Sequence, residues 1–481
     1  MSFFSFIKIF CKSNYLTFLI LILAFFVRFY NFDKFGFWGD EYLTFYISEP
    51  LHTYNEIFTK TLGSGDHVPP FYYYILNIYN YLFGYSAYSL RLFHIIFGVL
   101  TIVLVYFISN FLFPRSANNL VLFLLSINIF LIWCSNEVRV VSFVLFFQLL
   151  VILIFFKIIK EFNYKISISN ITLLILLNII SLTIHPLSIV IVMSQIFFLC
   201  ILLKIKKNQN NKKIFIYILY IFLSLCVYLL LNKEYFIWSL KGTRLEHNQL
   251  NINFFIGYNF RHYFTSYILG FINLIIIFLL LFRLKKNLFT NLYILYLLII
   301  FILTYIFIIF GTFLITGLNA QRYWSFLVPI ITIVNIYYLT KIKKNLFSKI
   351  LILFLIIYSS INYFKNINFP QIRKPDSPNL IKIFNNSNIN FIVSSNYYLF
   401  EHYLKYAYKN FNKKIISEEE INDINVDYWY LCLDLTWAQL KGSYSDEIYD
   451  CYPKNVQNNR HSKVESLKIN GFVLTKYKFN K

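Results

Sequence analysis

Two adjacent carboxylates, Asp40 and Glu41, follow the first long apolar segment in the stretch GFWGDEYLTFYISEP, residues 36–50. The aromatic residues Trp38 and Tyr42 flank the pair. A charged side chain is costly to hold close to hydrocarbon, so acids in such a setting indicate a functional site. A carboxylate placed there can act as general base toward a hydroxyl group. Because adjacent residues of a helix or turn point in different directions, we expect Asp40 to be the base and Glu41 to orient its neighbours.

Two other interpretations of this pair are open. The acids can be solvated interfacial groups that orient the chain in a bilayer. They can also be ligands of a divalent metal ion, although two adjacent acids without clear further ligands are weak evidence for one. We expect no metal ion and no other cofactor.

The composition indicates a polytopic helical membrane protein. Of the 481 residues, 58% are hydrophobic and only 14% are charged, whereas a soluble domain carries roughly a quarter charged residues. Apolar runs of about 20 residues, the length that crosses a bilayer, recur from Tyr15 to beyond Ile350. The net charge of +22 lies in short clusters between these runs. That distribution is typical of cytoplasmic loops, and it excludes the single basic face of a nucleic-acid-binding protein.

The apolar runs predict about eleven transmembrane helices. Runs such as LLILLNIISLTI do not alternate as the strands of a membrane barrel would. The predicted spans are 15–31, 88–113, 119–134, 140–158, 171–184, 186–203, 214–231, 263–282, 291–315, 323–340 and 348–364.

The stretch PPFYYYILNIYNYLFG, residues 69–84, decides the predicted topology. If it does not cross the bilayer, the basic loops all fall on the side of Lys8 and Lys12, as the positive-inside rule requires. We therefore predict a helix along the outer interface, where tyrosine is favoured. Of the acids before residue 365, only Glu161 then lies on the inside. The prediction is a multi-pass protein of the cell (inner) membrane with a cytoplasmic N-terminus and an extracytoplasmic C-terminus.

We predict two domains. Residues 1–365 form the transmembrane module, in which 32–87 are the first extracytoplasmic loop with its interfacial helices. Residues 366–481 form a small extracytoplasmic α/β domain. Its predicted elements are strands in INFIVSS (389–395) and DYWYLCLDL (427–435), a helix over 397–408, and a hairpin at Asn470–Gly471. Cys432 and Cys451 are candidates for a disulfide if this domain faces an oxidising compartment.

Several motifs resemble those of known membrane enzymes. A span that ends in Arg28, then FWGDE, then HVPPFYYYILNIYNYLFG is similar to the start of the GT-C fold membrane glycosyltransferases. The relatives are the protein O-mannosyltransferases and the bacterial aminoarabinose transferases. The segments SNEVRVVSF, TIHP and QRYWSFLVP resemble later motifs of the same family.

The resemblance implies a glycosyltransferase, either a hexosyl- or a pentosyltransferase. Its donor would be a sugar on a polyprenyl monophosphate, and its acceptor an envelope glycan, a lipid or a protein at the non-cytoplasmic face. In this family the Asp of the Asp–Glu pair acts at the acceptor, which implies Asp40 as general base. The partners are thus the lipid-linked donor, the acceptor and the bilayer, with no nucleic acid.

Further site residues follow from the resemblance and from their places at the outer boundary. Arginine suits a phosphate in a poorly hydrated site, and such cations would neutralise a monophosphate without a metal. An arginine that only extends to the interface is the alternative. We favour it for Arg91, and also for Arg28 and Arg261, which rank as phosphate ligands behind Arg139 and Arg322. The predicted donor-phosphate ligands are Arg139, Arg322, Arg28 and Arg261, and the predicted substrate-binding residues are Asp66, His67, Glu137 and His185.

Two other functions compete with the transferase. A transporter or flippase of a lipid-linked sugar would place ionisable groups near mid-membrane, whereas these spans carry almost none. A glycan polymerase or ligase with a diphosphate-linked donor would share much of the composition. The GDE and PPFYYY motifs favour the transferase.

Overall fold

The structure is a computed structural model of the whole chain. It describes residues 14–30, 32–33, 36–64, 68–161, 167–205, 211–235, 237, 259–283, 291–314, 321–341, 346–368, 375–394, 400–401, 403–404, 411–423, 425–433, 460–469 and 472–480. The chain divides into two compact units. The first contains Met1–Tyr30, Thr61–Tyr72 and His94–Ile367, and the second contains Asn31–Lys60, Tyr73–Phe93 and Asn368–Lys481. The predicted domain limits at 365 and 366 stay a prediction.

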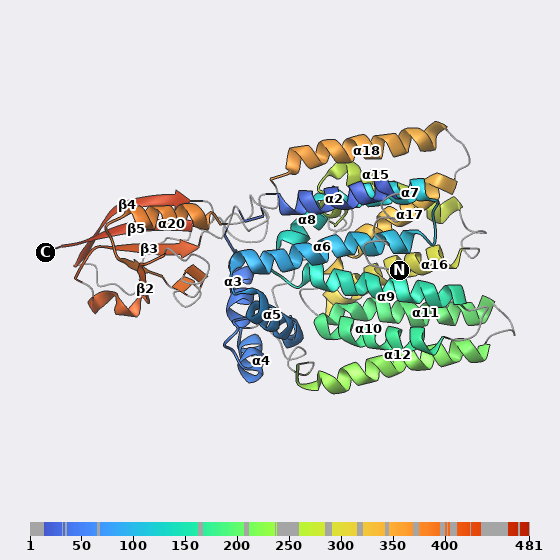
Figure 1. Cartoon of the computed structure of the whole chain (residues 1–481), viewed down its shortest axis with the longest axis horizontal. Coiled ribbons are helices and arrows are strands. Elements are labelled where there is room, and N and C mark those ends of the chain that lie inside the picture. The colour runs from blue at the N-terminus through green and yellow to red at the C-terminus, as the bar shows by residue number, and fades with distance from the viewer. Residues whose placement is uncertain are drawn as a thin grey trace. The chain divides into compact units, whose positions relative to one another are not determined.

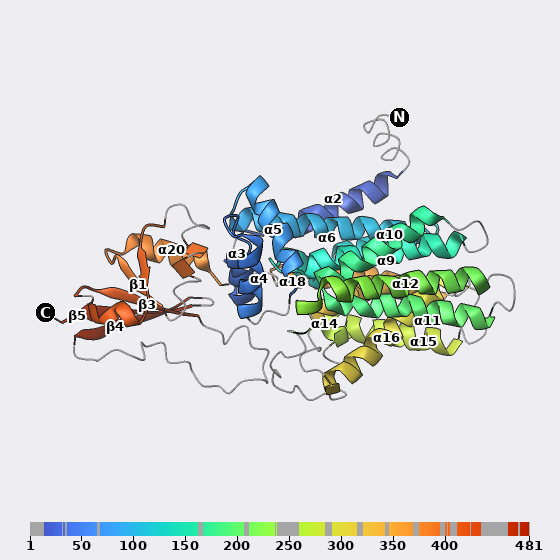
Figure 2. The ribbon, with the colours of Figure 1, turned by 90° about the horizontal axis from the view of Figure 1, so that it is seen from below.

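The first unit is built of apolar helices that run side by side (Figures 1 and 2). Among the described residues, six helices are long and apolar enough to cross a membrane. They are α6 (Ala87–Ser109), α9 (Val141–Glu161), α11 (Ile189–Ile205, preceded by the 3-10 turn Pro186–Ser188), α12 (Asn211–Leu231), α16 (Leu292–Leu314) and α18 (Leu346–Asn366).

Four shorter apolar helices complete the bundle, and they coincide with four further predicted spans. They are α2 (Tyr15–Phe29), α10 (Ile168–Ile184), α15 (Tyr267–Arg283) and α17 (Leu327–Lys341). Polar side chains join neighbouring helices inside the apolar core. The carboxamide of Asn178 donates to Gln195 at 3.0 Å, and the hydroxyl of Thr17 donates to Asn119 at 2.7 Å. Such pairs support helix association where there is little water to compete.

The predicted span 119–134 is wrong as one continuous helix. The structure has two helices there, α7 (Arg115–Ser126) and α8 (Ile129–Asn136), which meet at an angle of 57°. The cause is Asn128, whose side-chain oxygen accepts the backbone N–H of Leu131 at 2.9 Å and so begins a new helix. Its amide also donates to the carbonyl of Tyr263 in the short helix α14 (Phe260–Phe264) at 3.0 Å.

The stretch 69–84 forms the helix α5 (Pro70–Phe83), as predicted. It has 14 residues and is absent from the described helices that are long and apolar enough to span. Pro70 occupies its first position, where the missing N–H costs nothing. Its place at the outer interface stays a prediction.

The second unit combines α3 (Gly39–Ile47), most of α4 (Tyr54–Gly63) and of α5, and the start of α6 with the C-terminal sheet. The strands are β1 (Phe391–Val393), β2 (Lys414–Ile416), β3 (Tyr428–Leu433), β4 (His461–Ile469) and β5 (Phe472–Phe479), in the order β2-β1-β3-β5-β4. β1 is parallel to β2 and β3, whereas β5 is antiparallel to β3 and β4. Helix α20 (Ser377–Asn386) precedes the sheet in the chain.

The sheet confirms the strands predicted within 389–395 and 427–435, as β1 and β3, whereas β2 was not predicted. Ile469 pairs with Phe472, so β4 and β5 form the predicted hairpin, although its turn residues, Asn470 and Gly471, lie outside the described residues. Of the predicted helix 397–408, only Phe400, Glu401, Tyr403 and Leu404 are described, and they are helical. Cys432 is disulfide-bonded. Its proposed partner Cys451 lies outside the described residues.

Candidate active site

Asp40 and Glu41 lie in the first turn of α3, where the helix dipole favours negative charge. Glu41 is fully buried, and its carboxylate accepts the backbone N–H of Trp38 at 3.2 Å. This contact caps the helix, because it satisfies an amide that no residue within the helix can pair. Asp40 is only half-buried. The two acids therefore have different environments, and Glu41 is in a position to orient the loop.

Arg91 holds the loop that leads into α3. It is 2% exposed, and its guanidinium donates to the carbonyls of Phe32 at 3.0 Å and Gly36 at 2.7 Å. The same group lies 4.9 Å from the centre of the Phe37 ring. Sequence reasoning favoured an interfacial arginine without a ligand at this position. The sequence could not reveal these hydrogen bonds, because the two carbonyls lie more than 50 positions away from Arg91 in the chain.

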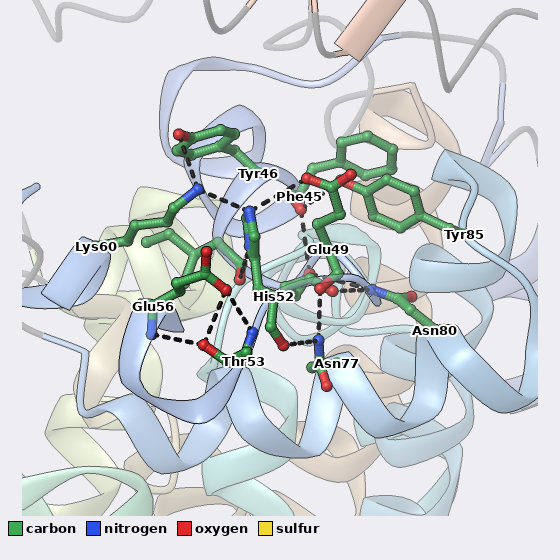
Figure 3. A network of polar contacts seen from close by, with 12 residues as sticks. Phe45, Tyr46, Glu49, His52, Thr53, Glu56, Lys60, Asn77, Asn80 and Tyr85 are labelled. Carbon is green, nitrogen blue, oxygen red and sulfur yellow. Dashed lines mark hydrogen bonds and ion pairs between the residues drawn. The ribbon is translucent and has the colours of Figure 1, made fainter. Parts of the chain in front are cut away.

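A polar network ties α3 to α4 and α5 (Figure 3). The amide of Asn80 donates to the Ser48 carbonyl at 2.8 Å, just past the end of α3. The Lys60 ammonium contacts Tyr46 Oη at 3.0 Å and His52 Nε2 at 2.7 Å. These contacts cross-link the helices that follow the acid pair.

The start of α4 has its own cap. Glu56 accepts both the backbone N–H of Thr53, at 2.7 Å, and its hydroxyl, at 2.9 Å (Figure 3). These hydrogen bonds hold the pKa of Glu56 below its ordinary value. The cap fixes where α4 begins after the turn.

The aromatic residues of α3 form an apolar support. Tyr42 and Phe45 are buried, and Phe45 stacks on Tyr85 with ring centres 4.1 Å apart. Burial raises the pKa of Tyr42 well above its ordinary value, and the neighbouring Tyr403 contributes to the same shift. Tyr42 therefore stays uncharged and serves as a packing group.

In the first unit, Arg28 secures the bent helix pair. Its side chain is 1% exposed, and its guanidinium donates to the carbonyls of Ala24 at 3.0 Å and Ser126 at 3.1 Å and to the Ser135 hydroxyl at 3.2 Å. Ser126 ends α7, so its carbonyl has no partner within that helix. Arg28 thus joins α2 to both α7 and α8. Its predicted contact with the donor phosphate stays a prediction.

Replacing Arg28 by Leu is expected to lower stability. The change removes three buried hydrogen bonds from a charged donor, each of which contributes about 1.5–3 kcal/mol. Arg28→Lys should lose less, since an ammonium can still reach one carbonyl. Thermal unfolding of the detergent-purified protein, followed by size-exclusion chromatography, measures both. An unchanged unfolding temperature for Arg28→Leu would contradict this role.

Other predicted residues gather where α8 ends. Glu137, Arg322 and Arg28 all lie near the thiol of Cys134 in α8. Glu137 and Arg139 both follow directly after the end of α8, and both side chains are buried.

His185 lies close to a neighbour of Arg322 in the chain. The His185 and Tyr323 rings are 4.6 Å apart, and Arg322 precedes Tyr323 in a 3-10 turn. His185 Nδ1 accepts the backbone N–H of Leu187 at 3.3 Å. The unprotonated Nδ1 leaves the other ring nitrogen, Nε2, to carry the hydrogen in the neutral ring.

The remaining predicted residues are less informative. Arg261 is exposed and lies over the ring of Tyr267, 4.1 Å from its centre. Asp66 and His67 lie outside the described residues. Within the described part of the chain, no three His, Cys, Asp or Glu side chains are grouped to hold a metal ion.

Comparison with known proteins places the fold. Residues 67–231 match the family model of dolichyl-phosphate-mannose-protein mannosyltransferase. The structure resembles ArnT from Cupriavidus metallidurans bound to undecaprenyl phosphate, with a TM-score of 0.53, 13% identity, and coverage of 97% of this chain and 98% of that chain. The apo state of the same protein gives a TM-score of 0.54 at 11% identity, with the same coverage.

A third solved structure extends the likeness. The Archaeoglobus fulgidus oligosaccharyltransferase in its apo form matches with a TM-score of 0.52 and 12% identity, over 87% of this chain and 69% of that chain. No curated protein sequence matches the chain.

The chain therefore has the GT-C fold of those structures, and its long apolar helices are those of a multi-pass membrane protein. Within that fold, the chain resembles the protein O-mannosyltransferase and aminoarabinose transferase family. The fold class predicted from the sequence is confirmed.

Proposed function

We propose that this protein transfers a hexosyl or pentosyl group from a polyprenyl monophosphate to an envelope glycan, a lipid or a protein, at the non-cytoplasmic face of the membrane. The observation that carries the proposal is the fold similarity to ArnT bound to undecaprenyl phosphate, which covers 97% of this chain. The family match over residues 67–231 supports a lipid-phosphate donor independently of that likeness.

In the proposed reaction, an acceptor hydroxyl attacks the sugar carbon that carries the phosphate. A new carbon–oxygen bond forms to the acceptor as the bond to the phosphate oxygen breaks. Asp40 takes the hydroxyl proton, and the polyprenyl monophosphate leaves with the electron pair. One carboxylate on the acceptor side suffices, as in inverting glycosidases. Glu41 orients the loop through its bond to the Trp38 amide.

We assign to arginines the role of neutralising the negative charge of the leaving phosphate. Arg139 and Arg322 are the leading ligands, because a guanidinium matches two phosphate oxygens in a poorly hydrated site. Arg28 and Arg261 are secondary candidates. Glu137, His185, Asp66 and His67 are assigned to sugar or acceptor contacts. No metal ion is required, since cationic side chains can neutralise a monophosphate.

We propose that the C-terminal domain is extracytoplasmic and that the N-terminus is cytoplasmic. The disulfide at Cys432 supports this orientation, because disulfides persist in oxidising compartments. Reporter fusions after Lys60 and after Ser116 are expected to give opposite signals, outside and inside. The same signal from both fusions would contradict the topology.

The transfer itself is tested in proteoliposomes with a polyprenyl-monophosphate sugar labelled in the sugar. We expect label in a glycan, lipid or peptide acceptor and free polyprenyl phosphate in equal amounts. Movement of intact donor across the bilayer without release of the sugar would instead identify a flippase. Mass differences in envelope glycans between cells with and without the protein would identify the acceptor.

A further inference from the structure

The loop before α3 forms hydrogen bonds to two parts of the C-terminal domain. One is the segment that precedes the sheet, and the other is the helical stretch between β1 and β2. All of these residues belong to the second unit. The backbone N–H of Gly36 donates to the carbonyl of Pro375 at 2.7 Å. The next N–H, of Phe37, donates to the hydroxyl of Tyr403 at 3.1 Å, and Tyr403 is 1% exposed. A buried N–H is costly to leave unpaired, so these two bonds favour one position of the loop.

Gly36 also packs too closely for any other residue. A β-carbon built there would lie 1.8 Å from the Ser377 Oγ and 3.1 Å from the Pro375 carbonyl oxygen. Ser377 is the first residue of α20. The loop and the start of α20 therefore pack directly against each other, and this close approach is possible only because glycine has no side chain.

Aromatic rings extend this contact from the sheet to α3. The Tyr403 ring lies edge-on to Tyr42, with centres 4.5 Å apart, and 5.0 Å from that of Phe37. Phe400 contacts Tyr42 at 5.6 Å on one side and Phe472 of β5 at 6.1 Å on the other. A continuous set of packed rings thus joins β5 to the helix that carries Asp40.

The loop is held from two directions. Arg91 binds the carbonyls of Phe32 and Gly36, whereas Pro375 and Tyr403 bind the amides of Gly36 and Phe37. Asp40 follows three residues after Phe37. A misplacement of about 1 Å in a catalytic group can cost about 100-fold in rate. The supports of this loop are therefore expected to affect the rate.

We propose that the C-terminal domain positions the catalytic loop, with Tyr403 as the principal positioning residue for Asp40. This inference rests on the proposed function, because it takes Asp40 as the base. Tyr403 is not assigned any contact with substrate. It acts through the Phe37 amide and the Tyr42 ring.

The first test compares two buried tyrosine hydroxyls of the same domain. Tyr403→Phe removes the acceptor of the Phe37 amide, whereas Tyr430→Phe removes a hydroxyl that donates to Glu418 within the sheet region. We expect Tyr403→Phe to lower kcat by about 10- to 100-fold with the KM for the lipid donor unchanged. Tyr430→Phe should leave both constants near wild type. Equal losses in the two variants would reduce Tyr403 to a stability role and overturn the proposal.

The second test is a compensating pair. Gly36→Ala should lower kcat, because its methyl group meets Ser377, and the double variant Gly36→Ala/Ser377→Gly should recover most of the loss. Ser377→Gly alone is the reference. No recovery would mean that the contact does not transmit the effect, and this would overturn the proposal.

The third measurement does not depend on activity. Hydrogen–deuterium exchange of the peptide 36–42 should rise in Tyr403→Phe and stay at the wild-type level in Tyr430→Phe. Faster exchange with unchanged kcat would overturn the positioning role while leaving the transferase in place. Wild-type turnover of Asp40→Asn, measured in the same assay, would overturn the base assignment of the proposed function instead.

Discussion

Replacing Asp40 by Asn is expected to lower the rate of sugar transfer by about 10²- to 10⁴-fold, the range that a general base contributes. The carboxamide has nearly the same shape but cannot take the proton from the acceptor hydroxyl. The helix should persist, because the Asp40 backbone carbonyl, not its side chain, accepts the Thr44 hydroxyl at 3.0 Å. Initial rates with labelled donor, at matched amounts of folded protein, measure the loss.

Glu41→Gln is the matched control for this prediction. Its amide oxygen can still accept the Trp38 N–H, so the cap is weakened and not lost. We expect Glu41→Gln to retain far more activity than Asp40→Asn. If Asp40→Asn turned over at the wild-type rate, or if the two variants were equally inactive, the division of roles between the acids would be wrong.

Replacing Arg139 or Arg322 by Ala is expected to lower kcat by about 10²- to 10³-fold, as when one preorganised donor to a developing anion is removed. The charge on the departing phosphate grows in the transition state, so the loss should appear in kcat more than in KM. Arg→Lys variants should recover only part of it, since an ammonium lacks the two-pronged geometry.

Lys349→Ala serves as the control for loss of a positive charge. Lys349 is exposed on α18 and lies in a basic segment that we assign to the cytoplasmic side. Its removal should leave transfer unchanged. Losses of similar size in Lys349→Ala and Arg139→Ala would show that net charge matters, and the phosphate assignment would fail.

Local patterns predicted much of the architecture. Long apolar runs identified the membrane helices because crossing a bilayer requires about 20 apolar residues. The Asn-Gly dipeptide between alternating runs identified the β4–β5 hairpin, since turn type and strand period are properties of neighbouring residues. The interruption at Asn128 was missed. Its side chain can cap a helix, but whether it does so depends on partners such as the Tyr263 carbonyl, 135 positions away.

The amino-acid sequence alone determined the membrane class, the resemblance to GT-C enzymes and the acid pair at residues 40 and 41, because hydropathy and short motifs are read along the chain. Only the tertiary structure decided what holds that pair. Glu41 is buried in the first turn of its helix, and Arg91 binds carbonyls of the preceding loop. The hydroxyl of Tyr403 accepts the backbone N–H of Phe37, which lies 366 positions earlier in the chain. Each of these partners is selected by packing in space, since a buried polar group must pair with whatever the fold brings within hydrogen-bonding distance.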